Sequence, residues 1–273
     1  VWRNEKPGPG RFRQFYQCDA DVVGSTSLWQ EVELVQLYDA VFSDLCLKGV
    51  TIKINNRKVL YGIAEAAGIA DRFMDMTVAI DKLDKVGIEG VRKELAERGI
   101  AETAIATVEK ILSSPSLEAL RPIFASSPTG LLGLDELERV FRFLSKVELK
   151  NELQFDITLA RGLSYYTGCI FEVAAKGVKM GSIGGGGRYA DLTGVFGVPG
   201  LSGVGVSFGA DRIYDVLEEL NLFPDSLLES VKVLLISFDE PTFEYAFECA
   251  TKLRKAGVST EIYPEPGKLK KQF

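Results

Sequence analysis

The stretch of sequence that decides the fold reads GVGVSFGADR at residues 203–212. Small residues alternate there with Val204 and Val206, which is the period of a strand, and the pattern becomes helical near Asp211. Glycines in a strand leave a flat surface for a planar ring. A cation at a helix start, such as Arg212, opposes the helix dipole, which indicates that it binds a ligand such as a triphosphate. The alternative is a core strand that packs closely on its neighbour.

Upstream, residues 182–189 read SIGGGGRY. Four consecutive glycines lose much backbone entropy on folding, and they let a ligand approach the backbone closely. The alternative is a flexible loop. The aliphatic and Arg-Tyr flanks differ from a Gly/Ser linker and favour a ligand site.

A third stretch reads ARGLSYYTG at residues 160–168. Arg161 follows an apolar strand predicted at 155–160, where a charge requires a partner. Tyr165 and Tyr166 would lie on opposite faces of an extended segment, one toward a pocket and one toward support. The alternative is a strand end with a snorkelling arginine and half-buried tyrosines.

The first 24 residues predict an antiparallel hairpin, because a Gly8-Pro9-Gly10 turn precedes a period-two pattern of arginine and phenylalanine. Arg3, Arg11 and Arg13 would concentrate positive charge on it, and a guanidinium matches two phosphate oxygens. Glu5 can accept a hydrogen bond from an adenine amino group. The alternative is a solvated hairpin with surface ion pairs.

Elsewhere the sequence predicts a helix at 28–48, a strand at 51–54 that ends in an Asn55-Asn56 turn, a helix at 57–70, strands at 169–174 and 203–208, and a helix at 210–220. Strand signals disappear between 81 and 148, which indicates a helical insertion. After a linker-like stretch at 221–230, a strand at 231–236, a helix at 241–256 and a strand at 259–263 open a β-α-β unit.

Composition excludes several classes of protein. The 273 residues contain no histidine, so Ser-His-Asp hydrolases and His-ligated metals are excluded. Four separated cysteines (Cys18, Cys46, Cys169 and Cys249) form no CxxC pair, which favours reduced thiols in the cytoplasm. The net charge of −6 argues against a general basic coat for nucleic acid, although not against a local patch. No apolar run reaches the roughly 18 residues of a membrane span, no secretory signal opens the sequence, and the natural start is expected to lie upstream of Val1.

Together the four segments resemble the histidyl-tRNA synthetase family. Their order matches class II motif 2 at 1–24, the two family-specific stretches at 161–168 and 182–189, and motif 3 ending in Arg212. The resemblance implies an α+β fold: a class II synthetase catalytic core on an antiparallel sheet with a helical insertion, then the start of an α/β anticodon-binding domain. The expected parts are 1–80 and 149–225 for the core, 81–148 for the insertion and 231–273 for the anticodon-binding domain.

The resemblance also implies residue roles. The catalytic residues would be Arg3 and Arg161, which hold the ATP α-phosphate from two sides, Arg161 standing where sister enzymes use a metal. ATP would be bound by Arg3, Glu5, Arg11 and Arg212. Histidine would be bound by Gln17, Asp21, Arg161, Tyr165, Tyr166, Gly185 and Gly186, with the glycines as a loop that forms the floor. Asp21 stands where the family usually has Glu, and Ser164 where it usually has Asp.

These roles agree with the chemistry of adenylate formation. The attacking carboxylate is already ionised, so catalysis requires alignment and charge stabilisation rather than a protein base. The implied partners are L-histidine, ATP with Mg²⁺ that has no assigned protein ligand, and tRNA(His); the family forms a homodimer through an upstream motif 1 that is absent here. No membrane partner is expected.

Two other interpretations of the sequence are a paralogue without aminoacylation and a different class II synthetase. A regulatory or binding paralogue without aminoacylation would usually lose the arginines or the family-specific stretches, and Arg3, Arg11, Arg161 and Arg212 are all present. Another class II synthetase would lack the pair of stretches at 161–168 and 182–189. We further expect Arg3, Arg161 and Arg212 to line one cavity. The insertion, which carries Lys82, Lys85, Arg92, Lys93 and Arg98, would contact the tRNA acceptor arm, unless these are only charges of a solvated helix surface.

Overall fold

The computed structural model describes residues 1–4, 6–113, 116–161, 165–190, 192–224 and 231–272. The chain divides into two compact units, Val1–Asn221 and Leu222–Phe273. Within the described ranges, no helix combines the length and the apolar character that a membrane crossing requires.

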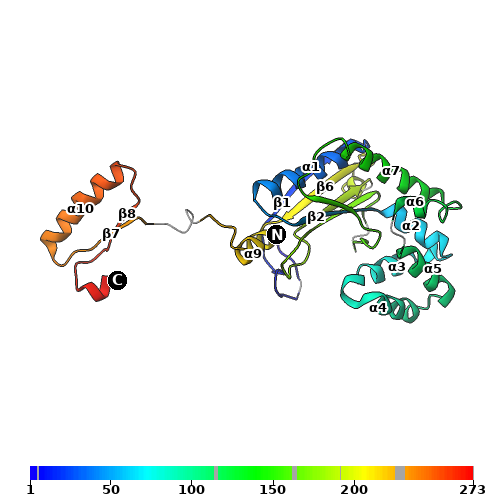
Figure 1. The fold of residues 1–273 in the computed structure, drawn as a ribbon, viewed down its shortest axis with the longest axis horizontal. Helices are drawn as coiled ribbons and strands as arrows, with labels where there is room; N and C mark the ends of the chain where they lie inside the picture. The colour runs from blue at the N-terminus through cyan, green and yellow to red at the C-terminus, as the bar shows by residue number, and fades with distance from the viewer. Residues whose placement is uncertain (5, 114–115, 162–164, 191, 225–230, 273) are drawn as a thin grey trace. The chain divides into compact units, whose positions relative to one another are not determined.

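A six-stranded sheet forms the centre of the first unit (Figure 1). Its order is β1 (Gln17–Val23), β6 (Gly203–Gly209), β5 (Gly184–Tyr189), β4 (Cys169–Ala175), β2 (Val50–Asn56) and β3 (Glu152–Phe155). Neighbours pair antiparallel except β2 and β3, which are parallel. This arrangement confirms the predicted α+β class.

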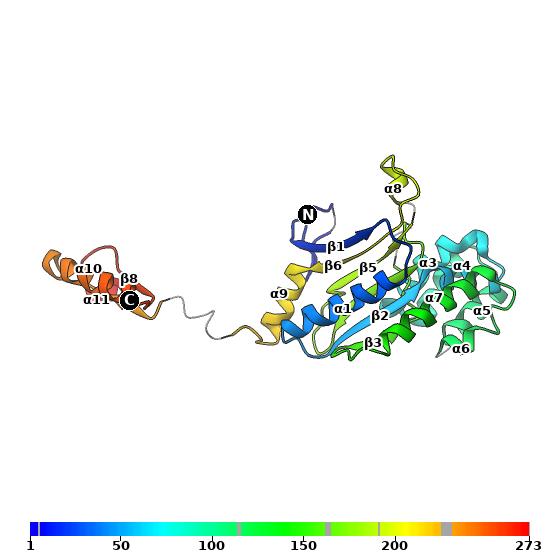
Figure 2. The same cartoon turned by 90° about the horizontal axis from the view of Figure 1, so that it is seen from above.

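Apolar helices cover one face of the sheet. Helix α1 (Trp29–Asp44) contacts β2 and β6, and α7 (Pro128–Leu144) contacts α1, α2 (Arg57–Ala66) and β2. Both run alongside the sheet (Figures 1 and 2). Tyr38 and Phe42 of α1 are fully buried and lie against Phe208 of β6, with ring centroids 4.9 and 5.8 Å away. The opposite face of the sheet is therefore left to polar side chains.

The remaining helices of this unit follow α2. They are η1 (Ala70–Arg72), α3 (Phe73–Ile80), α4 (Leu83–Glu97), α5 (Glu102–Leu112) and α6 (Leu117–Leu120) before α7, and α8 (Leu192–Val195) and α9 (Ala210–Glu219) after β5 and β6. Helix α4 is interrupted at Gly87, whose φ of 68° is not helical. The range 81–148 is helical as predicted, but the main contacts of its last helix, α7, are with α2, α1 and β2.

Three local predictions were wrong. Asn55 and Asn56 are buried residues of β2 rather than a turn. The strand predicted at 155–160 is β3, which ends at Phe155, because only residues 152–155 pair with β2. The four glycines are no loop: Gly184–Tyr189 is a strand paired on both edges. The hairpin predicted at the start is present, but its two arms pair only through isolated antiparallel bridges, between Trp2 and Gln14 and between Gly8 and Arg11. The continuous strand β1 begins after it, at Gln17.

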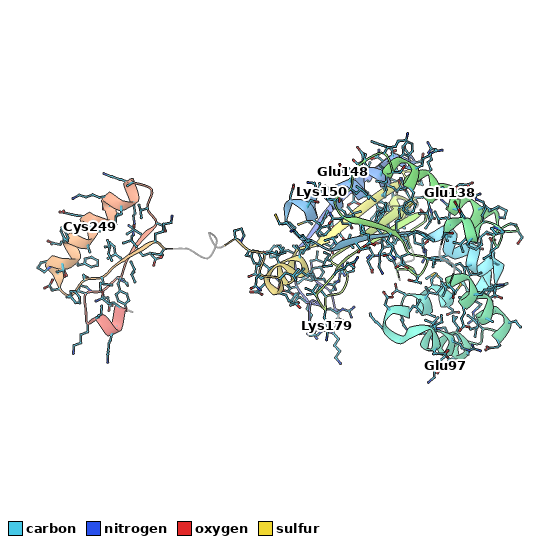
Figure 3. The ribbon with its side chains drawn as sticks, in the orientation of Figure 1. Glu97, Glu138, Glu148, Lys150, Lys179 and Cys249 are labelled. Atoms are coloured by element: carbon cyan, nitrogen blue, oxygen red, sulfur yellow. The ribbon has the colours of Figure 1, made fainter. Side chains whose placement is uncertain are left out.

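The second unit is a small β-α-β arrangement, as predicted. Strand β7 (Val233–Leu235) pairs in parallel with β8 (Thr260–Ile262), and α10 (Glu240–Lys255) connects them before α11 (Leu269–Gln272). Asp239 and Thr242 form a capping box at the start of α10, which carries Cys249 (Figure 3). Its assignment to an anticodon-binding domain stays a prediction.

Candidate active site

Two adjoining cavities lie on the polar face of the main sheet. The first is lined by the four arginines of the predicted phosphate site, together with residues of β5, β6 and α9: Arg3, Arg11, Arg161, Arg212, Gly184, Gly185, Ser207, Gly209 and Asp211 among others. The prediction that Arg3, Arg161 and Arg212 line one cavity with the glycine run in its wall is confirmed. Four guanidinium groups around one space make it suited to a polyanion.

Arg212 joins the hairpin to the sheet. Its Nε donates to the Gly10 carbonyl (2.6 Å) and its Nη1 to the Ser182 carbonyl (2.6 Å). Gly10 has a φ of 61°, which suits glycine, and it places the turn of the hairpin at the cavity. The neighbouring Asp211 accepts from the Tyr16 backbone N–H at 2.6 Å. The first turn of α9 therefore holds the turn of the hairpin at Gly10 and the segment at Tyr16 that leads into β1.

Arg3 lies on the other strand of the hairpin. Its backbone N–H donates to the Arg13 carbonyl (2.9 Å), and its Nη2 donates to Gln17 Oε1 (3.1 Å). The guanidinium also lies over the Phe15 ring, 5.0 Å from its centroid. Arg3 is thus oriented by Gln17, a predicted histidine-binding residue.

The glycines of the sheet provide space for side chains that cross it. A methyl group on Gly185 would overlap the Arg161 guanidinium, and one on Gly187 would overlap the Tyr166 ring. On β6, a methyl group on Gly205 would overlap the Asp21 carboxylate. The glycines were expected to lie directly under a ligand. In the structure the side chains of Arg161, Tyr166 and Asp21 lie over them, so a ligand would contact these side chains first.

Arg161 lies in a polar row across the sheet. Cross-strand pairing aligns Lys53 of β2, Glu172 of β4, Gly185 of β5 and Ser207 of β6. The Arg161 guanidinium fills the place above Gly185: its Nη1 donates to the Phe171 carbonyl (3.1 Å) and lies 3.8 Å from Glu172 Oε2. Burial raises the pKa of Glu172, while the charges of Arg161 and Lys53 oppose that rise. The arginine thus stands in the row where the glycine has no side chain.

The second cavity contains the remaining predicted histidine site. Its lining consists of Gln17, Asp19, Asp21, Tyr165, Tyr166, Gly185, Gly186, Tyr189, Leu192, Gly205, Val206 and Ser207. Every predicted histidine-binding residue except Arg161 is among them. Gln17, Gly185 and Ser207 line both cavities, so the two spaces meet at these three residues.

Two carboxylates, Asp19 and Asp21, and three phenols line this second cavity. Tyr189 Oη donates to Asp21 Oδ1 at 2.7 Å, and the Tyr165 and Tyr166 ring centroids are 4.6 Å apart. Burial raises the pKa of Tyr166 and of Tyr189, and the bond to Asp21 adds to the rise at Tyr189. Both phenols therefore stay protonated at neutral pH, as hydrogen-bond donors or acceptors beside a carboxylate.

Sequence reasoning missed three contributors. Tyr189 is the last residue of the glycine-rich strand β5, so its place in that stretch of sequence could have suggested a role. Ser207 Oγ donates to the Gly185 carbonyl (3.0 Å), and buried Tyr38 donates to the Ser207 carbonyl (3.2 Å). Neither has a sequence signal, because both depend on strand register. Two residues named in the sequence analysis lie outside the described residues: Glu5, a predicted ATP-binding residue, and Ser164, which stands where the family usually has Asp.

The described residues include no group of three or more His, Cys, Asp or Glu side chains placed to hold a metal ion.

Comparison with known proteins shows the family of this chain. A family model for histidyl-tRNA synthetase matches residues 1–213. A curated relative from Christiangramia forsetii, named histidine–tRNA ligase, is 55% identical over 280 residues, which cover 100% of this chain and 61% of the relative.

Solved structures give the same result. The crystal structure of histidyl-tRNA synthetase from Nostoc sp. PCC 7120 superposes with a TM-score of 0.77 at 29% identity, covering 100% of this chain and 65% of that one. A structure from Bacillus halodurans C, described as an ATP phosphoribosyltransferase regulatory subunit/histidyl-tRNA synthetase, shares the fold with a TM-score of 0.71 at 19% identity, over 92% of this chain and 65% of that one. The family model covers most of the chain, and the chain belongs to the histidyl-tRNA synthetase family.

Proposed function

We propose that the protein activates L-histidine with ATP to form histidyl-adenylate and then transfers the histidyl group to tRNA(His). The observation that carries this proposal is the junction of the two cavities at Gln17, Gly185 and Ser207. One cavity is rich in arginine and suits a triphosphate, and the other offers a carboxylate and phenols that suit an imidazole. The reaction joins the two substrates, so their sites must meet.

The chemistry assigns each side of the junction a part. The histidine carboxylate attacks the α-phosphorus, a new O–P bond forms, and the bond to the departing pyrophosphate breaks. Arg161 and Arg3 would stabilise the charge that develops on the α-phosphate, and Arg11 and Arg212 would hold the β- and γ-phosphates with Mg²⁺ that arrives on ATP. Glu5 would contact the adenine.

Histidine recognition would depend on Asp21 and the tyrosines. Asp21 accepts from Tyr189 at one oxygen, which leaves capacity for the substrate imidazole, and Tyr165 and Tyr166 would complete the pocket with Gln17, Gly185 and Gly186. An analogue without the imidazole N–H would cover the Asp21 carboxylate and the phenols without pairing them, which penalises its binding.

The wider assignments belong to the same proposal. The chain spans 61% of the length of the Christiangramia forsetii relative. Charging of tRNA(His), the homodimer formed through an upstream motif 1, the cytoplasmic location and the anticodon-binding role of 231–273 are inferred from the family.

Isothermal titration with L-histidine tests the proposal, with the other amino acids as controls. We expect binding of L-histidine and no measurable binding of glutamine, phenylalanine or lysine. Binding of none of the amino acids, or equal binding of several, would contradict the assignment of the second cavity.

A regulatory paralogue without aminoacylation is the second candidate, because the description of the Bacillus halodurans C structure, which shares the fold, names a regulatory subunit beside histidyl-tRNA synthetase. It is less supported, because curated relatives between 50% and 55% identical are named histidine–tRNA ligase. Pyrophosphate exchange dependent on histidine separates the two candidates.

A further inference from the structure

The segment that delivers Arg161 to the cavity is not a strand. Residues Asp156–Ala160, here called the arginine strap, follow the end of β3 and lead directly to Arg161, whose φ of 42° is left-handed. The Asp156 N–H donates to the Ile54 carbonyl (3.0 Å), and the Leu159 N–H donates back to the Asp156 carbonyl (3.0 Å). The strap therefore leaves the sheet at its first residue and curls over it.

Side chains of β2 and of the first residue of α2 hold the strap. Lys53 Nζ lies 2.8 Å from Asp156 Oδ2 at its start, and Arg57 Nη1 donates to the Ala160 carbonyl (3.3 Å) at its end. Asn55 lies between them and donates from Nδ2 to the Ile157 carbonyl (3.1 Å) and the Leu159 carbonyl (2.9 Å). Lys53 and Asn55 are two residues apart on β2, so both side chains leave the same face of the sheet.

Asn55 is the central and most buried of these attachments. Its exposed fraction is 0%, and both amide hydrogens are used on the strap. Its Oδ1 is buried without a hydrogen-bond partner among the described residues. An unpaired buried oxygen costs free energy, and an apolar side chain would avoid that cost. The Asn55 amide therefore provides two hydrogen-bond donors to the strap, while its own oxygen stays buried without a partner among the described residues.

The adjacent Asn56 has a different task. It leaves the opposite face of the sheet, where its Oδ1 accepts from the Lys58 N–H (2.9 Å) at the start of α2 and its Nδ2 donates to Glu136 (2.7 Å) on α7. The Asn-Asn pair of the sequence therefore divides its work: Asn56 joins the helices to the sheet, and Asn55 fixes the strap.

We propose that Asn55 is a positioning residue for Arg161: its amide sets the path of the arginine strap and thereby places the guanidinium over Gly185 at the junction of the two cavities. The inference rests on the proposed function for the rate effects that it predicts. A displacement of about 1 Å at a catalytic group can reduce a rate by roughly 10²-fold, so a residue without contact to the substrates can control the reaction.

The test is a double-mutant cycle on histidine-dependent pyrophosphate exchange, in the complete protein that carries this chain. Asn55→Ala removes both donors from the strap, and we expect kcat to fall by about 10- to 100-fold while the KM for ATP and the affinity for histidine change by about twofold or less. In the Arg161→Ala background the same substitution should lower kcat by about twofold at most, because the group that it positions is gone.

Asn151→Ala is the matched control. Asn151 Nδ2 donates to the Asp39 carbonyl (3.1 Å) and to Asp39 Oδ1 (2.9 Å), so its loss also removes amide hydrogen bonds, here partly buried ones away from the strap. We expect a lowered midpoint of thermal unfolding for both alanine variants and a normal kcat for Asn151→Ala only. Should Asn55→Ala fail to fold, Lys53→Gln loosens the strap at its partly exposed start, and we expect a fall in kcat that again disappears in the Arg161→Ala background.

The outcomes separate this inference from the proposed function. Equal effects of Asn55→Ala with and without Arg161, or a normal kcat in Asn55→Ala beside a large loss in Arg161→Ala, overturn the positioning role alone. A normal exchange rate in Arg161→Ala contradicts the catalytic assignment itself.

Discussion

Charged side chains are held differently in the sheet and in the inserted helices. Arg188 of β5 is 8% exposed and Glu31 of α1 is 0% exposed, and Arg188 Nε donates to Glu31 Oε1 at 2.8 Å. In α4, Lys93 and Glu97 form a pair at 3.9 Å with exposed fractions of 78% and 66%. Figure 3 shows Glu97 at the outer edge of this helical region.

The difference shows where charge determines geometry. A buried ion pair that loses one partner leaves an uncompensated charge in a medium that solvates it poorly, whereas an exposed pair is replaced by water. We therefore expect substitutions on the sheet to change stability or rate strongly, and substitutions on the inserted helices to change them little.

The largest effect is expected at Arg188. Beyond Glu31, its Nη1 donates to the Ser25 carbonyl (2.5 Å) and to Ser202 Oγ (3.1 Å), so Arg188→Ala should lower the free energy of unfolding by about 3–5 kcal/mol. Urea unfolding at pH 7 measures it. The double variant Arg188→Met/Glu31→Leu replaces both charges by apolar side chains, so we expect its free energy of unfolding to lie well above that of Arg188→Ala. A double variant as unstable as Arg188→Ala would show that Arg188 stabilises the protein through its contacts with backbone carbonyls instead.

Arg161 should show the next largest effect, on rate rather than stability. Removing one preorganised donor to a developing charge costs roughly 10²-fold, or about 2.7 kcal/mol, so Arg161→Ala should slow adenylate formation by that factor or more. Affinity for histidine should change little, and lysine should rescue poorly because a point charge cannot form two parallel hydrogen bonds. Pyrophosphate exchange in the complete protein provides the measurement, and a near-normal rate would make Arg161 an ordinary surface residue.

Adjacent glycines of β5 should divide the two kinds of effect. Gly185→Ala would displace the movable end of Arg161, so we expect about a tenfold lower exchange rate with modest loss of stability. Gly186→Ala would meet the Gly205 backbone carbonyl, which cannot move aside, and should chiefly lower the unfolding midpoint. Gly267→Ala, with no atom within 4 Å of the added carbon, is the control. Equal rate losses at 185 and 186 would contradict the separate tasks.

The sequence predicted the parts of this site but not their mutual support. The arginines and the glycine stretch were identified because residue type and order carry those signals, and the resemblance joined them into one cavity. The strap, the row from Lys53 to Ser207 and the buried role of Asn55 depend on which strands are neighbours and in what register. A period of two indicates a strand but not its partners. The sequence therefore predicted a turn at Asn55, which is in β2, and a strand at 156–160, which pairs with none of the described strands. Helix α7 was assigned to the insertion for the same reason, since its apolar stripe does not say which helix it meets.

The smallest effect is expected on α4, where it would decide between the two interpretations of the inserted helices. Lys82 bonds to Glu94 at 2.7 Å, and Arg98 bonds to Glu94 at 2.7 Å and to Asp75 at 2.8 Å, so much of the predicted basic surface is already paired within the protein. Lys93 is more exposed than Lys82 and Arg98, and Lys93→Ala should change the free energy of unfolding by less than about 0.5 kcal/mol.

If α4 contacts the tRNA acceptor arm, Lys93→Ala should raise the KM for tRNA by a few fold at low salt, and the difference should shrink as the salt concentration rises. Pyrophosphate exchange without tRNA should stay normal. Charging measured between 50 and 200 mM salt tests this, with Glu97→Ala as the matched change on the same turn. An unchanged KM at every salt concentration would favour a solvated helix surface, and α4 would then take no part in binding tRNA.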